Sequence, residues 1–185
     1  LGAWANTPVL FFDQCDFSEN ETSGDMIRFA SSNVLIHDSI IEKNAGTENG
    51  AILSGPNTNL LLSSVTVAEN QGRYVGGLAF SGSHLILMDT VVKDNLCGEG
   101  VSGICMASGK LSISGGAIYD NQLESGRGID IYIGYDAIAR IPPASLMQDD
   151  AVDFSRYVWY RYNNNRLYQT TVAIPGGLTA IEAAA

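Results

Sequence analysis

The sequence has few cysteines, few basic residues and no long apolar run, and each shortage excludes a class of protein. Three cysteines in 185 residues are too few for a fold built on a disulfide framework. Lysine and arginine number 10 against 20 acidic residues, and the net charge of −10 opposes the phosphate neutralisation that nucleic-acid binding requires. No apolar run approaches the ~20 residues that span a bilayer. We therefore expect neither nucleic acid as a partner nor membrane insertion by this segment.

A short motif recurs along most of the chain. Each copy has an apolar residue, one further residue, a charged residue and an asparagine. The copies are FSEN, IEKN, VAEN, VKDN and IYDN, and their asparagines are Asn20, Asn44, Asn70, Asn95 and Asn121. The steps between these asparagines are 24, 26, 25 and 26 residues. A period this constant is typical of a solenoid.

Apolar residues stand ten, eight and three residues before each asparagine. The three sets are Leu10, Val34, Leu60, Leu85 and Leu111; Phe12, Ile36, Leu62, Leu87 and Ile113; and Phe17, Ile41, Val67, Val92 and Ile118. A third stretch follows each asparagine, with the apolar pairs Ile27 and Phe29, Ala51 and Leu53, Leu78 and Phe80, Ile104 and Met106, and Ile129 and Ile131. Apolar residues at every second position indicate short strands with one buried face.

Three short strands per period cannot satisfy their backbone groups within one coil, because no neighbouring strand lies beside them. Stacking the coils supplies parallel neighbours at ~4.8 Å. The sequence therefore predicts an all-β fold over residues 1–141, a right-handed parallel β-helix of about six coils with about 25 residues each.

The recurring asparagine has a structural role in this arrangement. A corner between two strands needs a residue that tolerates the left-handed conformation, and asparagine does so better than other non-glycine residues. Stacked amides also hydrogen-bond to one another. We expect the five asparagines to form a structural ladder, because a catalytic group would not be repeated in every coil. Asn20 also begins the glycosylation sequence Asn20-Glu21-Thr22, and a glycan there would compete with the ladder.

These repeats resemble the right-handed β-helix passenger domains of polymorphic outer-membrane proteins and related autotransporter-type adhesins, which carry FxxN and GGA[ILV] words. Phe17 to Asn20 matches FxxN, and Gly115 to Ile118 reads GGAI, while the other coils have Ile or Val in place of Phe. The resemblance covers residues 10–141. It implies a secreted or surface-displayed passenger with an adhesive or scaffold function, and it brings no catalytic residues.

The period stops after Ile141, where Pro142 and Pro143 neither donate to a sheet nor continue a strand. Residues 142–185 therefore form a separate, non-repeat unit. Its centre predicts a hairpin, with two strands around a turn at Asn163–Asn165. We expect this unit to cap the column or contact another subunit, and a sugar-binding platform is the alternative. The contact residues would be Tyr157, Trp159, Tyr160, Arg161 and Tyr162.

The residue before the ladder asparagine is acidic in three successive coils, as Glu69, Asp94 and Asp120. Carboxylates stacked ~5 Å apart repel unless water or a cation screens them, so a Ca²⁺ site is one interpretation. Ca²⁺ takes six to eight oxygen ligands, however, and only one per coil is visible. A solvated acidic stripe is the simpler interpretation, and we expect no cofactor and no metal centre.

The sequence singles out no clear catalytic pair. Asp38 and Asp89 stand at equivalent places two coils apart, and His37 precedes Asp38. Their separation of roughly 10 Å is too long for a shared proton but not for an inverting glycosidase. Ordinary solvent-facing polarity is the alternative. Further residues predicted to face outward, on different coils or strands, are Arg28, Lys110 and Asp130.

Cys97 and Cys105 lie close enough in the sequence to pair. Cys105 sits between the inward Ile104 and Met106, so it should point outward. We expect a loop-closing disulfide, with free thiols or metal ligation as alternatives, and a disulfide would favour an oxidising compartment. Cys15 occupies an inward place, where it should be a buried apolar filler.

The sequence as a whole predicts a non-catalytic, extracellular or cell-surface module with a structural or adhesive role. It begins at Leu1 and lacks a secretion signal, so we expect it to be a piece of a longer protein or surface fibre. Other protein subunits or surface glycans are the expected partners, and open column ends could assemble head to tail. The alternative is a carbohydrate-active β-helix, either a polysaccharide lyase or a tailspike-like glycosidase.

Overall fold

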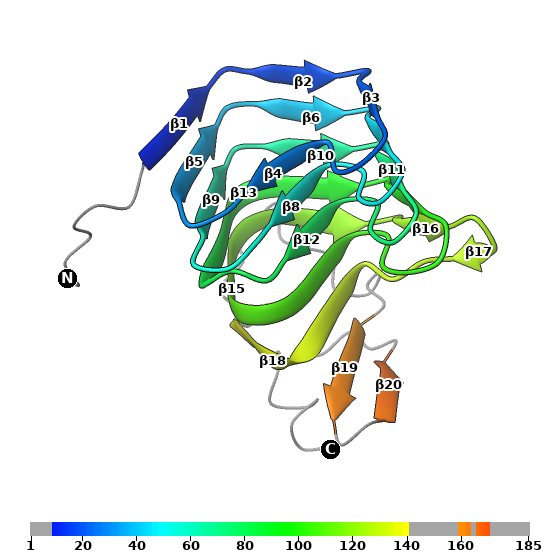
Figure 1. Cartoon of the computed structure of the whole chain (residues 1–185). Coiled ribbons are helices and arrows are strands. Elements are labelled where there is room, and N and C mark those ends of the chain that lie inside the picture. The colour runs from blue at the N-terminus through cyan, green and yellow to red at the C-terminus, as the bar shows by residue number, and fades with distance from the viewer. Residues whose placement is uncertain (1–8, 141–158, 164–165, 171–185) are drawn as a thin grey trace.

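The chain winds into a parallel β-helix of about five turns (Figure 1). The computed structural model describes residues 9–140, 159–163 and 166–170. The described residues form strands and no helix, so the predicted all-β solenoid is confirmed. The predicted count of about six coils is too high, because β18 (Ile131–Arg140) begins a turn that the described residues do not complete.

Three stacks of parallel strands form the walls of the column. The first wall contains β1 (Val9–Asp13), β5 (Asn33–His37), β9 (Asn59–Ser63), the start of β13 (His84–Lys93) and the middle of β15 (Ile104–Tyr119). The second wall contains β2 (Asp16–Ser18), β6 (Ile40–Glu42), β10 (Thr66–Ala68) and the ends of β13 and β15. The third wall contains β4 (Ile27–Phe29), β8 (Ile52–Ser54), β12 (Leu78–Phe80), the start of β15 and β18.

A short sheet forms the corner between the second and third walls. Its parallel strands are β3 (Glu21–Thr22), β7 (Ala45–Gly46), β11 (Gln71–Gly72), β14 (Leu96–Cys97) and β16 (Gln122–Leu123). The last strand, β17 (Gly126–Arg127), turns back antiparallel to β16. This corner sheet lies along the right-hand side of the column in Figure 1.

The predicted apolar rows stack vertically inside the first two walls. Leu60 pairs in register with Leu85, and Leu85 with Leu111. All three side chains are 2% exposed or less, and each fully buried leucine stabilises the fold by ~1.5–3 kcal/mol. The rows eight and three residues before the asparagines are buried in the same way, as Ile36, Leu62, Leu87 and Ile113 and as Ile41, Val67, Val92 and Ile118.

The first coil departs from this burial. Leu10 is 38% exposed, and Phe12 and Phe17 are only partly buried against the core. No described coil covers this end of the column, so the apolar pattern continues there without complete burial.

The third wall is displaced by one or two residues in two coils. Ile52 and Ser54, rather than Ala51 and Leu53, stand in register with Leu78 and Phe80. In the last coil Ile131 and Ile133 take the places predicted for Ile129 and Ile131. Because side chains alternate between the two faces of a strand, a small change in loop length moves which residues face inward.

Left-handed residues make two corners of each coil. The residues just before the ladder asparagines, Glu19, Lys43, Glu69, Asp94 and Asp120, have φ between 53° and 57°. A second row six residues before each asparagine also has positive φ, at Gln14, Asp38, Ser64, Asp89 and Gly115. The prediction that the asparagine itself adopts this conformation is therefore wrong, since the residue beside it turns the chain.

The asparagines form a continuous amide ladder behind these corners. The backbone N–H and Nδ2 of Asn44 both donate to Asn70 Oδ1, at 3.1 and 2.9 Å, and Asn70 makes the same pair to Asn95. Nδ2 of Asn70 also donates to the Ile41 carbonyl one coil back, at 2.9 Å. Asn44, Asn70, Asn95 and Asn121 are buried, so the hydrogen bonds satisfy polar groups that water cannot reach.

Asp130 ends the ladder. Its Oδ1 accepts the Asn121 backbone N–H at 3.1 Å and Nδ2 at 2.8 Å, and the residue is only 3% exposed. The outward placement predicted for Asp130 is wrong, because the short β16–β17 excursion returns the chain to the ladder after nine residues instead of a full period.

A C-terminal hairpin adds to the last coil. β19 (Trp159–Asn163) pairs in parallel with β18, and β20 (Arg166–Thr170) pairs antiparallel with β19. The predicted hairpin is present, and it extends the edge of the column at the bottom of Figure 1. The predicted boundary at residue 142 lies outside the described residues.

Candidate functional site

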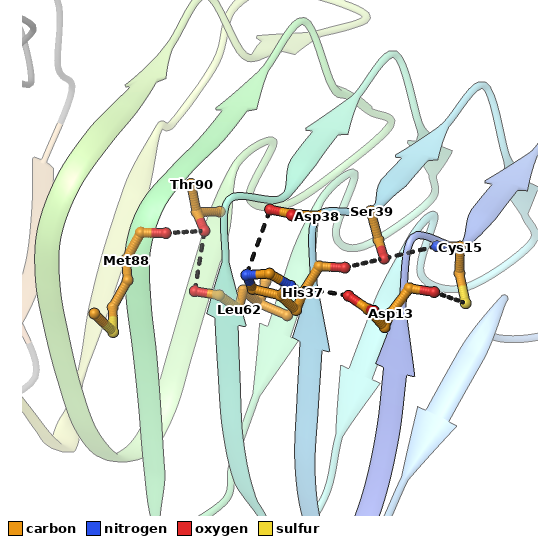
Figure 2. A network of polar contacts seen from close by, with 8 residues as sticks. All are labelled: Asp13, Cys15, His37, Asp38, Ser39, Leu62, Met88 and Thr90. Carbon is orange, nitrogen blue, oxygen red and sulfur yellow. Dashed lines mark hydrogen bonds and ion pairs between the residues drawn. The ribbon is translucent and has the colours of Figure 1, made fainter.

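One corner of the column gathers an imidazole and two carboxylates (Figure 2). His37 ends β5, and its Nδ1 lies 2.9 Å from Asp13 Oδ1 of the preceding coil. Its Nε2 lies 3.5 Å from Oδ1 of Asp38, which is a left-handed corner residue. The three side chains are between 41% and 46% exposed. Coil stacking brings Asp13 to His37, although 24 residues separate them.

The carboxylates raise the pKa of His37 above its usual value. The largest cause is the hydrogen bond with Asp13, and the negative charges of Asp38 and Asp13 add to it. Both ring nitrogens face a carboxylate, which favours the doubly protonated imidazolium. The two carboxylates therefore favour the protonated form of His37, which makes its imidazole less suited to accepting a proton from a substrate.

Asp38 and Asp89 lie in the same corner row with Ser64 between them. The Asp38 N–H donates to the Ser63 carbonyl, and the Ser64 N–H donates to the Met88 carbonyl. Two strand spacings of ~4.8 Å place the aspartates about 10 Å apart along the column. The structure brings Asp38 to His37 and leaves Asp89 two coils away.

Hydroxyl groups line the inner side of this corner (Figure 2). Ser39 Oγ donates to the His37 carbonyl at 2.6 Å and accepts the Cys15 N–H at 3.0 Å. Thr90 Oγ1 donates to the Leu62 carbonyl at 3.1 Å. Ser39 and Thr90 are buried, so they satisfy backbone groups of the turn. Cys15 is half-buried, not the buried filler that was predicted, because it belongs to the first coil.

A groove of about 670 Å³ runs over the corner sheet, from β3 to the chain that follows β16. Arg73 Nη2 lies 3.2 Å from Glu99 Oε1, and the Arg73 guanidinium carbon lies 5.0 Å from the centre of the Tyr74 ring. Gln71 Nε2 donates to Glu124 Oε1 at 3.2 Å across two coils. Polar side chains from successive coils therefore form one continuous lining.

Glycines in the groove lining allow the following loop to approach closely. A Cβ at Gly46 would lie 2.2 Å from the Asn49 carbonyl oxygen, and a Cβ at Gly72 would lie 2.1 Å from that of Val75. Only glycine avoids these overlaps. Cys97 occupies the corresponding place in the next coil, in register with Gly72.

Cys97 and Cys105 are free thiols, which corrects the predicted disulfide. Cys97 is fully buried at the corner, where its Sγ lies 3.1 Å from the Tyr74 carbonyl oxygen and accepts the Gly100 N–H at 3.0 Å. Cys105 lies in the third wall, in register with Ala79. Burial raises the pKa of Cys97, and it raises the pKa of Cys105 to about 11. The two thiols belong to different sheets, and burial disfavours the reactive thiolate form of each.

The acidic row of Glu69, Asp94 and Asp120 is exposed along the corner and supplies its left-handed residues. Lys93 Nζ lies 3.2 Å from Asp94 Oδ2, so part of the row's charge is balanced by a neighbouring lysine. Within residues 9–140 and the hairpin strands, no three histidine, cysteine, aspartate or glutamate side chains form a group that could hold a metal.

The stacked coils and the corner rows agree with a comparison of the sequence with known families. Residues 4–139, which are most of the chain, match the family described as right handed beta helix region. This chain belongs to the right-handed β-helix family. No curated protein and no solved structure matches it.

The aromatic contact residues predicted for this right-handed β-helix are only partly placed. Trp159, Tyr160, Arg161 and Tyr162 lie in β19, and Tyr157 lies outside the described residues. In the part of the chain that the structure describes, no helix is long and apolar enough to cross a membrane.

Sequence reasoning missed Asp13, Arg73 and Glu99 in this right-handed β-helix. Asp13 precedes His37 by 24 residues, and Arg73 precedes Glu99 by 26, so each pair is separated by one period. The same counting that located the asparagines would have found both pairs. The apolar and asparagine rows recur in every coil, whereas these pairs are formed by charged residues that occur in single coils.

Proposed function

We propose that this right-handed β-helix is a non-catalytic structural or adhesive module that works outside the cell and binds surface glycans in the groove over its corner sheet. The groove of about 670 Å³ is the observation that carries the proposal. Its lining crosses successive coils, so it offers contacts at ~4.8 Å steps to an extended chain lying along the column.

The groove side chains suit a ligand rich in hydroxyl groups. Arg73 presents planar N–H donors, Glu99 and Glu124 present acceptors, and Gln71 presents both. Carboxylates outnumber basic groups in the lining, so we expect neutral or amino sugars to bind in preference to acidic polysaccharides.

The binding proposal is tested by screening the protein against an array of neutral, amino and acidic glycans and titrating the best ligand by calorimetry. Arg73→Ala should weaken binding at least about tenfold, because it removes several hydrogen bonds to the ligand. Lys93→Ala, which lies outside the groove, is the matched control and should bind as the unmodified protein does. A protein that binds no glycan, or an Arg73→Ala variant with unchanged affinity, would contradict the proposal.

The extracellular location is proposed from the resemblance of the FxxN and GGA[ILV] words to those of surface passengers. Cys97 and Cys105 are free thiols, so a disulfide no longer supports an oxidising, extracellular compartment. Antibody labelling of intact cells, together with blotting of the culture medium, tests the location. Recovery of the native protein only from the cell interior would contradict it.

A carbohydrate-active β-helix is the second candidate, and the cluster of His37, Asp13 and Asp38 is the observation that favours it. An enzyme of this kind would release reducing ends as a hydrolase or an unsaturated product as a lyase. Assaying a polysaccharide panel for both products separates the candidates. Turnover of a polysaccharide that Asp38→Asn abolishes would show that the function is catalysis. Binding of a glycan without turnover would support the non-catalytic module.

A further inference from the structure

The corner sheet under the groove has a period of two coils. With the coils numbered from Asn20 in coil 1 to Asn121 in coil 5, the residues one place after these asparagines stand in register. Coils 1, 3 and 5 place long polar side chains in this row, whereas coils 2 and 4 place short or apolar ones. In coil order the row reads Glu21, Ala45, Gln71, Leu96 and Gln122.

A second row of the groove lining shows the same alternation. It lies three places after each asparagine and, from coil 2 to coil 5, reads Thr47, Arg73, Gly98 and Glu124. The backbone keeps these residues in equivalent places, because the N–H groups of Gly98 and Glu124 each donate to a carbonyl of the preceding coil. A short residue therefore precedes each long polar one along the groove.

Contacts between side chains gather the polar groups over the odd-numbered coils. Glu99 is the charged residue that coil 4 adds to the lining, and its Oε1 lies 3.2 Å from Arg73 Nη2 of coil 3. Gln71 Nε2 of coil 3 donates to Glu124 Oε1 of coil 5 at 3.2 Å, so polar side chains of the odd coils reach across the coil between them. The groove thus has polar ridges at coils 1, 3 and 5 and gaps at coils 2 and 4.

This repeat suits a ligand whose own repeat is two units long. Coils stack at ~4.8 Å, so the ridges recur at about 10 Å. In an extended β-linked chain of the cellulose or chitin type, each sugar ring is turned over relative to the last. The same face recurs at every second ring, over a length close to two coil steps. An α-linked chain of the amylose type curves away instead and presents no face at this repeat.

We infer that the groove binds an extended β-linked polysaccharide of neutral sugars, one ring to each coil. This inference rests on the proposed glycan binding and names its ligand class. The rings at coils 3 and 5 hydrogen-bond through their hydroxyl groups to Gln71, Arg73 and Glu124, which offer both donors and acceptors. The rings at coils 2 and 4 lie over Ala45 and Gly98, whose small size leaves room for them.

The linkage is tested with cellohexaose and maltohexaose, which have the same composition and length, and with chitohexaose as a second β-linked chain. In calorimetry on the full chain, the tighter of the two β-linked ligands should bind at least about tenfold more tightly than maltohexaose. A smaller preference, or binding confined to other glycans, would overturn the inference and leave the proposed glycan binding intact. Binding of no glycan at all would contradict both.

The two-coil period is tested by placing a long side chain in a gap. Ala45→Gln does so at coil 2, between Glu21 and Gln71, and should weaken binding of the preferred oligosaccharide at least about tenfold. Ala117→Gln is the matched control, because Ala117 stands in register with Val91 in the second wall, outside the groove, and this variant should bind as the unmodified chain does. Melting temperatures verify that both variants fold. Unchanged affinity in Ala45→Gln, or an equal loss in both variants, would overturn the inference.

Discussion

At the scale of single residues, many polar side chains among the described residues bond to a partner one coil away. Asn44 bonds to Asn70, and Arg73 pairs with Glu99, each across 26 residues. The exposed ion pairs contribute little to stability, because water screens them, whereas the buried amides contribute more, because an unpaired buried group is costly. Replacing an exposed partner should therefore change local charge, and replacing a buried one should change stability.

The titration of His37 tests the exposed corner cluster. Its pKa should exceed 6.5 in the folded protein and fall towards that value in Asp13→Asn, because the hydrogen bond with Asp13 is the main cause of the rise. A raised pKa stabilises the fold below pH 6.5, and this contribution is lost as the pH rises through the folded-state pKa. NMR titration of the imidazole measures the shift. Asp16→Asn is the control and should leave it unchanged, and a wild-type pKa at or below 6.5 would contradict the assignment.

The three thiols provide a second residue-scale prediction. Unreduced, denatured protein should show three reactive thiols, since none is paired. In the native protein at pH 8, Cys105 should react far more slowly, because a pKa of about 11 leaves about one thiol in a thousand ionised. Mass spectrometry after timed alkylation measures both. A single reactive thiol in the denatured protein would instead show that two of the three cysteines form a disulfide.

At the scale of elements, the amide ladder joins successive coils. Asn70→Ala removes the side-chain donor and acceptor of one rung. The buried amides of Asn44 and Asn95 then each lose a hydrogen bond, so the free energy of unfolding should fall by about 2–4 kcal/mol. Asn20→Ala is the matched control, and it should cost less than about 1 kcal/mol because Asn20 is exposed and its Oδ1 accepts from no described residue. Urea unfolding measures the free energy of unfolding of the two variants. An equal loss in both would argue that the buried amides contribute no more to stability than the exposed one.

The corner glycines make a second prediction at this scale. Gly72→Ala places a Cβ 2.1 Å from the Val75 carbonyl oxygen and 2.5 Å from the Gly50 nitrogen, so the loop must move. The free energy of unfolding should fall by about 2–4 kcal/mol. Gly24→Ala, with no atom within 4 Å of the added Cβ, should change it by less than about 0.5 kcal/mol. Thermal unfolding of both variants distinguishes a packing effect from a general effect of alanine.

At the scale of the whole molecule, the column is a one-dimensional stack in which each coil contacts its neighbours, so its ends control association. Removing residues 142–185 deletes the hairpin and exposes the backbone edge of β18. The truncated chain should melt at a lower temperature and form oligomers, because an open strand edge pairs with other chains. Size-exclusion chromatography with light scattering measures this. A truncated chain that remains a monomer with unchanged stability would show that the hairpin is not a cap.

The period and the apolar alternation were sufficient, from sequence alone, to determine the class of fold and the vertical register of its first two walls. Leu60, Leu85 and Leu111 are three of many residues at fixed distances from an asparagine, and only a stacked column buries all of them at once. The hairpin was also predictable, because its strand and turn residues are contiguous. These features depend on local sequence repeated at constant spacing.

Only the tertiary structure decided which residue turns each corner, which residues of the third wall face inward and which charged side chains meet. Left-handed φ belongs to Glu69 and not to Asn70, since the buried amide must keep its hydrogen bonds while its exposed neighbour bends the chain. Asp130 enters the ladder because a short excursion replaces a full coil. The groove is lined by residues that successive coils contribute over the corner sheet. Such outcomes follow from packing between coils, to which residues distant in sequence contribute jointly.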